Sequence, residues 1–157
     1  MRHLLSSTLI MLATLMPSAV AAAPTYVIRH LERAPGDDPT LTERGAARAE
    51  QLAEVLAGAN IKAVFATATR RAQETGAPLA RRLGLAVTTY NPRDVDALVA
   101  AVKAAGGPVL IVGHSNTVAE LVARFGGDKP AALGEQDYGT LFVVHDGTGQ
   151  VHRIELN

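Results

Sequence analysis

The stretch TYVIRHLERAPGDDPTLTERG, Thr25 to Gly45, shows how this chain alternates between two kinds of structure. It opens with a short β-rich run that ends at Arg29 and His30, continues through a polar loop, and reaches Thr42, a residue type that caps helix starts. An amphipathic segment follows Thr42, so the stretch predicts a strand, a loop and a helix in that order. This order is the repeating unit of α/β proteins.

The same alternation continues toward the C-terminus. The last two β-rich runs surround a glycine-containing turn and predict a hairpin, and we expect the second helix to be irregular near Gly76 and Pro78. The expected architecture is three-layer α/β/α, with a mostly parallel central sheet, helices on both faces and a C-terminal antiparallel hairpin. The expected strands are 25–29, 62–67, 86–90 and 108–114, the helices 41–58, 70–84, 92–107 and 115–127, and the hairpin 139–156.

Length and composition favour one domain and remove several classes of function. The 157 residues are enough for a single substantial core. The 15 basic and 15 acidic residues balance, so no overall positive field favours nucleic acid or an anionic membrane, and without Trp a base-stacking platform has no support. There is no Cys, which excludes disulfides and thiolate catalysis, and no Walker or dinucleotide motif indicates ATP or NAD. Strong positive potential must therefore be local.

The first residues have the pattern of a secretory signal peptide. Arg2 precedes a short apolar run, and small residues suited to signal peptidase follow it. The run is shorter than the roughly 20 residues that a membrane-spanning helix needs. We expect residues 1–22 to be the signal peptide, the mature protein to start at Ala22 or Ala23, and residues 23–157 to form the domain. The expected location is periplasmic or secreted, with no stable membrane span after cleavage.

Polar residues gather where the expected strands end. In open α/β sheets the ligand binds beyond the carboxyl ends of the strands. Taken singly, an Arg-His pair could be polar residues leaving a strand, and a histidine at a strand end could have only a structural hydrogen bond. The groups that the predicted topology brings to this rim are Arg29, His30, Thr67 and His114.

The helices that follow two of these strands add further candidates. Arg71 lies just inside the second helix and can reach back to the rim, whereas we expect Arg70 to face solvent. The helix expected from Ser115 would point free backbone N–H groups at the same rim, so Ser115 and Asn116 are candidates for binding phosphate or substrate.

Two arginines and two histidines around one crevice suit a phosphoryl group. Guanidinium groups match phosphate oxygens in bidentate geometry and stay charged, while a neutral imidazole can attack phosphorus. We expect no metal and no cofactor. His145 and His152 flank the hairpin turn and could face each other, but two histidines without a third ligand make a poor zinc site, and we interpret them as an exposed strand pair.

Four motifs, IRHLER, LTERG, TRRAQET and VGHSNT, occur in an order and at a spacing that resemble the histidine phosphatase superfamily, which has the phosphoglycerate mutase-like fold. Members carry Arg-His-Gly at the first strand end, Leu-Thr-x-x-Gly at the first helix, Ser-x-x-x-Arg-Ala-x-Gln-Thr at the second, and a late Gly-His or Ala-His. The resemblance covers essentially all of residues 23–157. It implies that His30 becomes phosphohistidine, that Arg29 and Arg71 clamp the phosphate, and that His114 and Thr67 complete the pocket.

The chain departs from the family pattern in two places. Leu31 replaces the usual glycine, and HSN replaces the His-Asp of one branch, which leaves the proton donor unassigned. Asp94 lies where another branch carries its glutamate, but it could equally stabilise a helix start. Glu32 is close to His30 but could instead anchor the loop. Tyr138 and Asp137 precede the last strands and are candidates for the rim.

The resemblance implies a metal-independent phosphatase that acts through phosphohistidine, and the N-terminal residues imply that it is exported. Its expected substrate is a phosphorylated small molecule or a phosphorylated envelope sugar. Three alternatives remain. One is a phosphoglycerate mutase-type phosphotransferase, which the lack of a long insertion to retain a bisphosphate disfavours. Another is a non-catalytic phosphate-binding or interaction module that kept the pocket and lost turnover. The third is a structural α/β domain without pocket chemistry, which would require every motif match to be accidental. The sequence names neither the substrate nor the oligomeric state.

Overall fold

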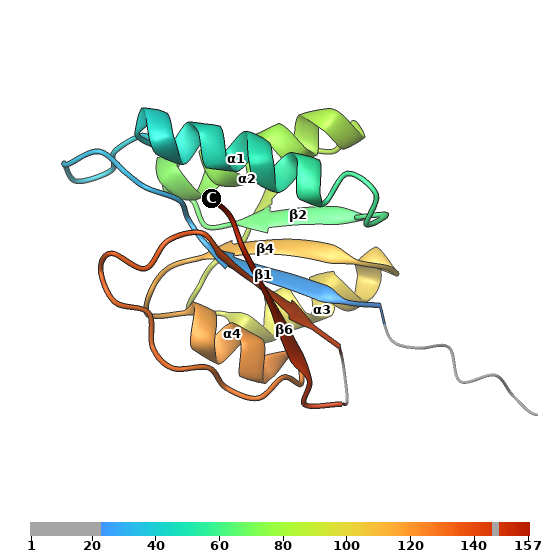
Figure 1. Cartoon of the computed structure of the whole chain (residues 1–157). Coiled ribbons are helices and arrows are strands. Elements are labelled where there is room, and N and C mark those ends of the chain that lie inside the picture. The colour runs from blue at the N-terminus through green and yellow to red at the C-terminus, as the bar shows by residue number, and fades with distance from the viewer. Residues whose placement is uncertain (1–22, 146–147) are drawn as a thin grey trace, which may run out of the picture.

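The computed structural model describes residues 23–145 and 148–157, so the expected signal peptide lies outside the described part of the chain. Figure 1 shows strands and helices alternating as the sequence predicts. Among the described residues no helix combines the length and hydropathy needed to cross a membrane. The strands are β1 (Thr25–Arg29), β2 (Ala63–Ala66), β3 (Val87–Thr89), β4 (Val109–Gly113), β5 (Thr140–Val144) and β6 (Val151–Glu155), and the helices are α1 (Glu43–Val55), α2 (Arg70–Leu83), α3 (Val95–Ala105) and α4 (Val118–Arg124).

One mixed sheet contains these strands in the order β3-β2-β4-β1-β5-β6. The first four in this order run parallel to their neighbours, and β5 and β6 add antiparallel pairs at one edge. The predicted fold class, a mostly parallel α/β sheet with a C-terminal hairpin, is confirmed. At the hairpin, His145 follows the end of β5 while His152 of β6 pairs with Val143, so the two histidines are diagonal neighbours, with ring centroids 5.6 Å apart.

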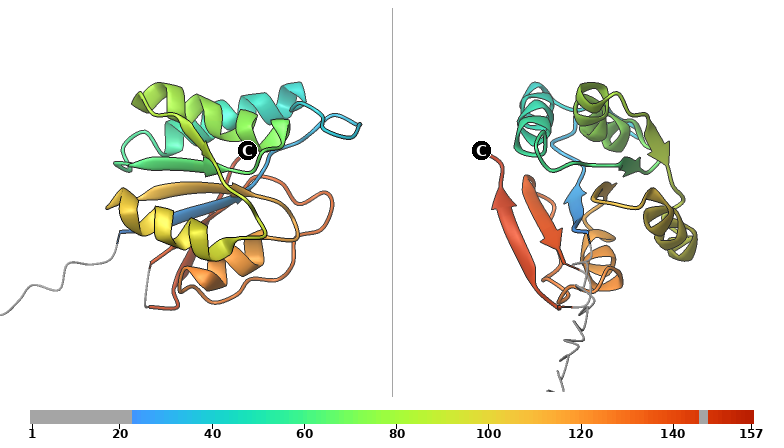
Figure 2. Two further views of the ribbon diagram at one scale, coloured as in Figure 1. Left: turned by 180° about the vertical axis from the view of Figure 1, so that it is seen from behind. Right: turned by 90° about the vertical axis from the view of Figure 1, so that its right-hand side faces the viewer.

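Helices cover both faces of the sheet and divide the core in two. Figure 2 shows α1 and α2 on one face, and α3 and α4 on the other. Successive strand residues point to opposite faces, so Leu110 and Val112 of β4 join the core under α1 and α2, while Val109 and Ile111 join the core over α3 and α4. Because both faces are covered, β4 is buried along its whole length, which explains its continuous apolar sequence.

The start of α1 lies very close to the loop that connects β1 to α1. Thr42 caps α1 as predicted, with its Oγ1 accepting from the backbone N–H of Gly45 at 3.1 Å. A Cβ at position 45 would lie 2.2 Å from the carbonyl oxygen of Glu32, so only glycine lets the helix start lie against this loop. The loop is also closed by the N–H of Thr42, which donates to that same carbonyl at 2.8 Å.

Two helices differ from the sequence expectation in their course or their start. α2 continues through Gly76 and Pro78 without interruption, and both residues are buried. A Cβ at position 76 would lie 2.9 Å from Val64 of β2, so the glycine lets the helix lie close to this strand. α3 begins at Val95 rather than near Pro92.

The expected start of the last helix at Ser115 is wrong. The residues from Ser115 to Thr117 form a turn, and α4 begins only at Val118. The carbonyl of His114 accepts from the N–H groups of both Thr117 and Val118 at 3.0 Å, which closes this turn before the helix starts. Ser115 and Asn116 therefore belong to a turn beside the strand end and not to a helix terminus.

Candidate active site

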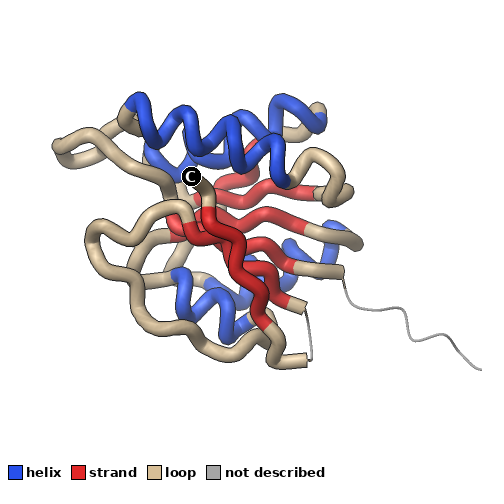
Figure 3. Tube along the Cα trace, in the orientation of Figure 1, coloured by secondary structure: helices blue, strands red, loops and turns tan. Residues whose placement is uncertain are grey.

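Two histidines stand side by side at the carboxyl ends of adjacent parallel strands. Arg29 of β1 is in register with Gly113 of β4, and the N–H of His30 donates to the carbonyl of Gly113 at 2.9 Å. This pairing extends the ladder by one residue and places His30 beside His114. The two rings are 5.3 Å apart between centroids and inclined by 64°. Figure 3 shows the loops gathered around this end of the sheet, including the long loop before β5.

The ring of His30 is held in one tautomer. Its Nδ1 lies 2.9 Å from the carbonyl oxygen of Leu31, and since a carbonyl only accepts, Nδ1 carries the proton and Nε2 keeps a free lone pair. His30 is 3% exposed. Burial lowers the pKa of His30 to about 4, the Leu31 hydrogen bond opposes this, and the positive charge of Arg71 adds to it. The ring is therefore neutral at pH 7.

His114 is held by hydroxyl groups of the residue that follows β2 and of the turn that follows β4. Its Nε2 is 2.9 Å from Oγ1 of Thr67, which follows β2 and is itself buried, and Oγ1 of Thr69 lies 3.3 Å from that hydroxyl. The backbone N–H of His114 donates to Oγ1 of Thr117 at 2.9 Å. Burial, with a smaller contribution from the positive charge of Arg71 and Arg29, lowers the pKa of His114 to about 4.

Arg70 and Arg71 are neighbours at the start of α2 but differ in their exposure to solvent. Arg71 is partly buried and contributes to the cleft beside His30, whereas Arg70 is exposed and is not among the residues that line it. Asp38 accepts from the backbone N–H of Arg70 at 2.9 Å and lies 3.8 Å from Nη1 of Arg71. The buried Nε of Arg71 has no hydrogen-bond partner within the described residues.

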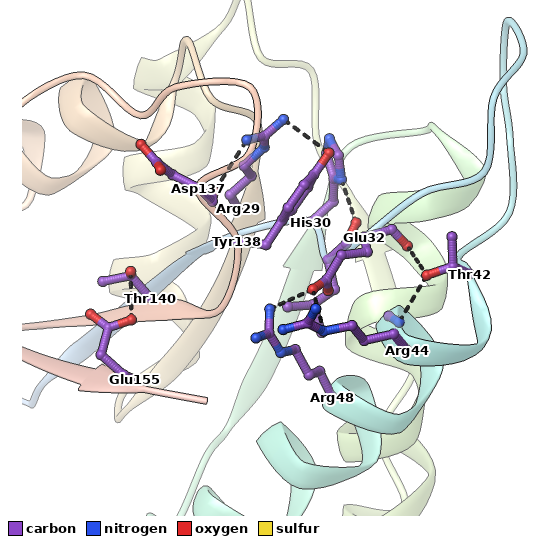
Figure 4. A network of polar contacts seen from close by, with 12 residues as sticks. Arg29, His30, Glu32, Thr42, Arg44, Arg48, Asp137, Tyr138, Thr140 and Glu155 are labelled. Atoms are coloured by element: carbon purple, nitrogen blue, oxygen red, sulfur yellow. Dashed lines mark hydrogen bonds and ion pairs between the residues drawn. The ribbon is translucent and has the colours of Figure 1, made fainter. Parts of the chain in front are cut away.

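Arg29 holds the long loop before β5. Its Nη1 donates to the carbonyl oxygens of Gly134, Glu135 and Asp137 at 2.7, 3.1 and 3.1 Å. Its guanidinium carbon lies 4.1 Å from the centre of the Tyr138 ring. Figure 4 shows the two side chains next to each other. The Nε of Arg29 is buried and has no partner among the described residues. The Nη1 of Arg29 thus holds residues 134–137 in place, a contact that the sequence did not predict. Its Nε remains a donor without a partner among the described residues.

These groups line a cleft of about 360 Å³ whose surface is almost entirely polar. Two of its residues were not predicted. Arg33 lies in the IRHLER motif, where its nearness to His30 was the available signal. Glu135 comes from a loop with no periodic pattern, so only the fold brings it to the site. The lining residues are Arg29, His30, Arg33, Arg71, His114, Ser115, Asn116 and Glu135.

The two proton-donor candidates from the sequence are not among these lining residues. Glu32 is engaged by Arg48, and Nε of Arg44 lies 3.3 Å from the same carboxylate oxygen, so Glu32 anchors the loop to α1 (Figure 4). Asp94 is exposed and caps α3, where its Oδ1 accepts from the N–H of Ala97 at 3.0 Å. Within the described residues no group of three His, Asp or Glu side chains gathers in a way that could hold a metal ion.

Comparison with known proteins shows which proteins this chain resembles in sequence and in fold. The profile of the histidine phosphatase superfamily (branch 1) matches residues 26–94, a segment that includes His30 and Arg71. The matched segment is less than half of the 157 residues, and over it the chain resembles this superfamily; its fold is phosphoglycerate mutase-like. Two uncharacterized proteins of Mycobacterium tuberculosis, Rv0525 and MT0547, are 43% identical to it over 74 residues, 41% of this chain and 36% of theirs. The match thus spans about a third of the length of these curated relatives.

Solved structures share the fold across nearly their whole length. The protein histidine phosphatase SixA complexed with tungstate has a TM-score of 0.64 at 22% identity, covering 83% of this chain and 94% of SixA. Mycobacterial glucosyl-3-phosphoglycerate phosphatase with inorganic phosphate has a TM-score of 0.65 at 20% identity, covering 87% and 97%. The α-ribazole phosphatase from Shigella flexneri has a TM-score of 0.64 at 17% identity, covering 85% and 96%.

Proposed function

We propose that this protein is a phosphatase that hydrolyses a phosphorylated substrate through a phosphohistidine formed on Nε2 of His30. The observation that carries the proposal is that the His30 ring is buried, neutral and held in one tautomer. It is buried, its Nδ1 is committed to the carbonyl of Leu31 at 2.9 Å, and its pKa is lowered to about 4, so a neutral nucleophile is held rigidly in the cleft. Rigid placement of a reacting group removes much of the entropic cost of attack.

The neighbouring cations supply the rest of the site. Arg29 and Arg71 both line the cleft and are suited to binding the oxygens of the transferring phosphoryl group and neutralising its charge. His114 adds a further ring nitrogen beside His30. Ser115, Asn116 and Thr67 complete the proposed binding residues, Thr67 through its hydrogen bond to His114. Two of the solved structures with this fold are complexes with tungstate and with inorganic phosphate, which supports an oxyanion as the ligand.

The reaction proceeds in two balanced steps. Nε2 of His30 forms a bond to phosphorus while the ester P–O bond breaks, and the departing oxygen takes up a proton from solvent water. A water molecule then attacks the phosphohistidine and the P–N bond breaks. This water gives one proton back to solvent, and inorganic phosphate leaves with the ring neutral again. No step requires a resident metal. The class of substrate proposed is a phosphorylated small molecule or envelope sugar.

Hydrolysis of p-nitrophenyl phosphate by residues 23–157 tests the proposal. We expect release of phosphate by the wild type, no change on adding a chelator, and no turnover by His30→Ala with an unchanged circular dichroism spectrum. A wild type that binds inorganic phosphate but hydrolyses no phosphomonoester would instead indicate the non-catalytic module. Retention of a bisphosphate with transfer to a second hydroxyl would indicate the mutase-type phosphotransferase.

Export is a separate part of the proposal and rests on the sequence of residues 1–22. We expect cleavage of this segment and a periplasmic or secreted mature protein. N-terminal sequencing of the protein recovered from the producing cell should give Ala22 or Ala23 as the first residue. Soluble protein that still begins at Met1 would contradict export.

A further inference from the structure

Strand β6 forms an open edge of the sheet. It pairs with β5 on one side, and among the described residues no strand pairs with it on the other. In the right-hand view of Figure 2, β6 lies at the outer edge of the sheet, away from the helices. The four residues from His152 to Glu155 are all exposed. An exposed strand edge presents backbone N–H and C=O groups to which another strand can bond.

The backbone hydrogen bonds show which residues of β6 face this edge. In an antiparallel pair, successive residues of a strand point their N–H and C=O groups alternately to the two sides. The N–H of Leu156 donates to the carbonyl of Gly139 at 2.9 Å, so every second residue back from Leu156 bonds toward β5. Val151, Arg153 and Glu155 therefore point outward. Within the described residues, none of these three has a backbone hydrogen bond to a further segment.

The residues just before β6 are closed on their outer side, which limits the open edge to the strand itself. The N–H of Gly149 donates to the carbonyl of Gly126 at 3.1 Å, and the N–H of Asp128 donates to the carbonyl of Gly149 at 2.9 Å. The segment that follows α4 thus bonds to Gly149 from outside. The open stretch therefore runs from Val151 to Glu155.

The side chains of this stretch combine an exposed apolar group with two opposite charges. Ile154 is 36% exposed. Arg153 and Glu155 point to the other face of the sheet, because successive strand residues alternate. Within residues 23–145 and 148–157, no ion pair within 4.0 Å includes either of these two charges. Glu155 accepts from the hydroxyl of Thr140 at 2.9 Å. The edge thus carries one positive and one negative group, two residues apart, that are available to a partner.

A second copy of β6 complements this edge in one register. Because outward-facing residues must bond to outward-facing residues, a two-fold antiparallel pair can be centred on Arg153, Ile154 or Glu155. Centring it on Arg153 or on Glu155 places like charges directly opposite each other, which is destabilising. Centring it on His152 would place Glu155 opposite Gly149, whose outer side is already bonded. Centring it on Ile154 places Arg153 of each copy opposite Glu155 of the other.

The same register suits the backbone and the apolar side chain. Arg153 of one copy and Glu155 of the other exchange both of their N–H···O bonds, once on each side of the axis. Ile154 lies between these two pairs in the non-hydrogen-bonded position, where opposite Cα atoms approach to about 4.5 Å and the side chains are closest. Each Ile154 therefore covers apolar surface of the other, which removes that surface from water.

We propose that two copies of this protein associate through antiparallel β6 strands, with Ile154 opposite Ile154 and two Arg153–Glu155 ion pairs across the edge. The six strands of each copy then form one continuous sheet. Both copies use the same patch, so the pair is closed and does not extend into fibres. The contact uses none of the residues that line the cleft, so it is independent of the proposed function.

Reversing the charges at the edge tests the pairing. A single strand pair is small for a protein interface, so we expect a dimer that dissociates on dilution. Sedimentation equilibrium of the purified protein over a series of concentrations gives its dissociation constant. Arg153→Glu and Glu155→Arg each replace two opposite-charge pairs by two like-charge pairs, so we expect each to weaken dimerisation at least about tenfold. Arg93→Glu is the matched control, because it reverses an exposed charge before α3, and it should dimerise like the wild type.

Mixing the two variants tests the register. In the mixed pair, the introduced glutamate faces the introduced arginine, and the native Glu155 of one variant faces the native Arg153 of the other. We expect an equimolar mixture of Arg153→Glu and Glu155→Arg to dimerise about as well as the wild type, although neither variant does so alone. A mixture that stays monomeric while the wild type dimerises would show that the copies meet on another surface, and would overturn the proposal.

A cross-link locates the two-fold axis. The chain has no cysteine, so Ile154→Cys introduces one thiol per copy and brings two of them within disulfide range in the proposed dimer. His152→Cys is the control, because position 152 lies opposite Leu156 and its counterpart is roughly 13 Å away along the strand, too far for a disulfide. We expect mild oxidation to give a covalent dimer of Ile154→Cys and not of His152→Cys.

Two results would contradict the pairing of β6 with itself. Equal cross-linking of Ile154→Cys and His152→Cys would show that the register is wrong. A wild type that is monomeric at every concentration, with no cross-link in Ile154→Cys, would overturn the proposal, whether the edge is then left open or bound by a different partner.

Discussion

At the scale of single residues, the site depends on how a buried histidine stays neutral. Burial is the largest cause that lowers the pKa of His30, and the positive charge of Arg71 adds to it. The same two causes act on His114. A dianionic phosphate bound between the rings would oppose both and raise both pKa values.

The first prediction concerns the titration of His30. NMR of the ring protons in the ligand-free protein should give a midpoint near pH 4 rather than the ordinary 6.5, with a His30→Asn variant to assign the signal. Because the folded pKa is the lower one, the unfolded chain binds the proton first as pH falls. Stability is therefore fully present above about pH 6.5 and declines toward pH 4. A midpoint near 6.5 would mean that the ring is solvated.

The second prediction separates two adjacent arginines. Arg71→Ala should lower turnover by about 10²- to 10³-fold, the usual cost of losing one donor to a charged transition state. Arg70→Ala should stay near the wild type, since its side chain is exposed and only its backbone N–H is bonded to Asp38. Steady-state kinetics of the two variants with one phosphomonoester tests this ranking. If Arg70→Ala lost more turnover than Arg71→Ala, the assignment within TRRAQET would be shifted by one residue.

At the scale of elements, the strands were predictable and the loops were not. His30 and His114 come together because β1 and β4 are parallel neighbours, an arrangement that apolar runs and strand-helix alternation indicate. The position of Arg71 near the cleft was also predictable, because α2 begins at Arg70, directly after the loop that follows β2. Glu135 reaches the cleft through the carbonyl contacts that Arg29 makes to residues 134–137, and no pattern in a sequence of irregular loop residues encodes such contacts.

The boundary of α4 shows a second limit of prediction from sequence. Ser115 is a good helix-capping residue type, yet the helix begins three residues later. The hydroxyl of Thr117 bonds to the backbone of His114 and holds the intervening residues in a turn. Local propensity did not distinguish a hydroxyl that caps a helix from one that closes the turn before it.

The third prediction tests how α1 approaches the loop before it. Replacing glycine by alanine within a helix is normally stabilising, but at Gly45 the new methyl group would lie 2.2 Å from the carbonyl of Glu32. We expect Gly45→Ala to lower the free energy of unfolding by about 1–3 kcal/mol through overpacking. A methyl group added at Gly58 would have no atom within 4 Å, so Gly58→Ala is the matched control and should not destabilise. Equal urea midpoints for the two variants would refute this account.

At the scale of the whole molecule, the order of the strands determines where the chemistry takes place. From β1 the chain continues to β2 and β3 on one side, returns to place β4 between β2 and β1, and then adds β5 and β6 on the other side of β1. The carboxyl ends of β1 and β4 therefore lie next to each other at the centre of the sheet, where strand order reverses and ligands bind in open α/β folds. A chain without overall charge concentrates three arginines there.

The central claim is that phosphate passes through His30, and trapping the phosphoenzyme tests it most directly. Residues 23–157 are mixed with a ³²P-labelled phosphomonoester, quenched rapidly, and divided between acid and base before peptide mapping. We predict label that survives base, is lost in acid and maps to His30, that is unaffected by chelator, and that is absent from a folded His30→Ala variant. Label on another residue, or turnover at the wild-type rate by folded His30→Ala, would contradict the claim.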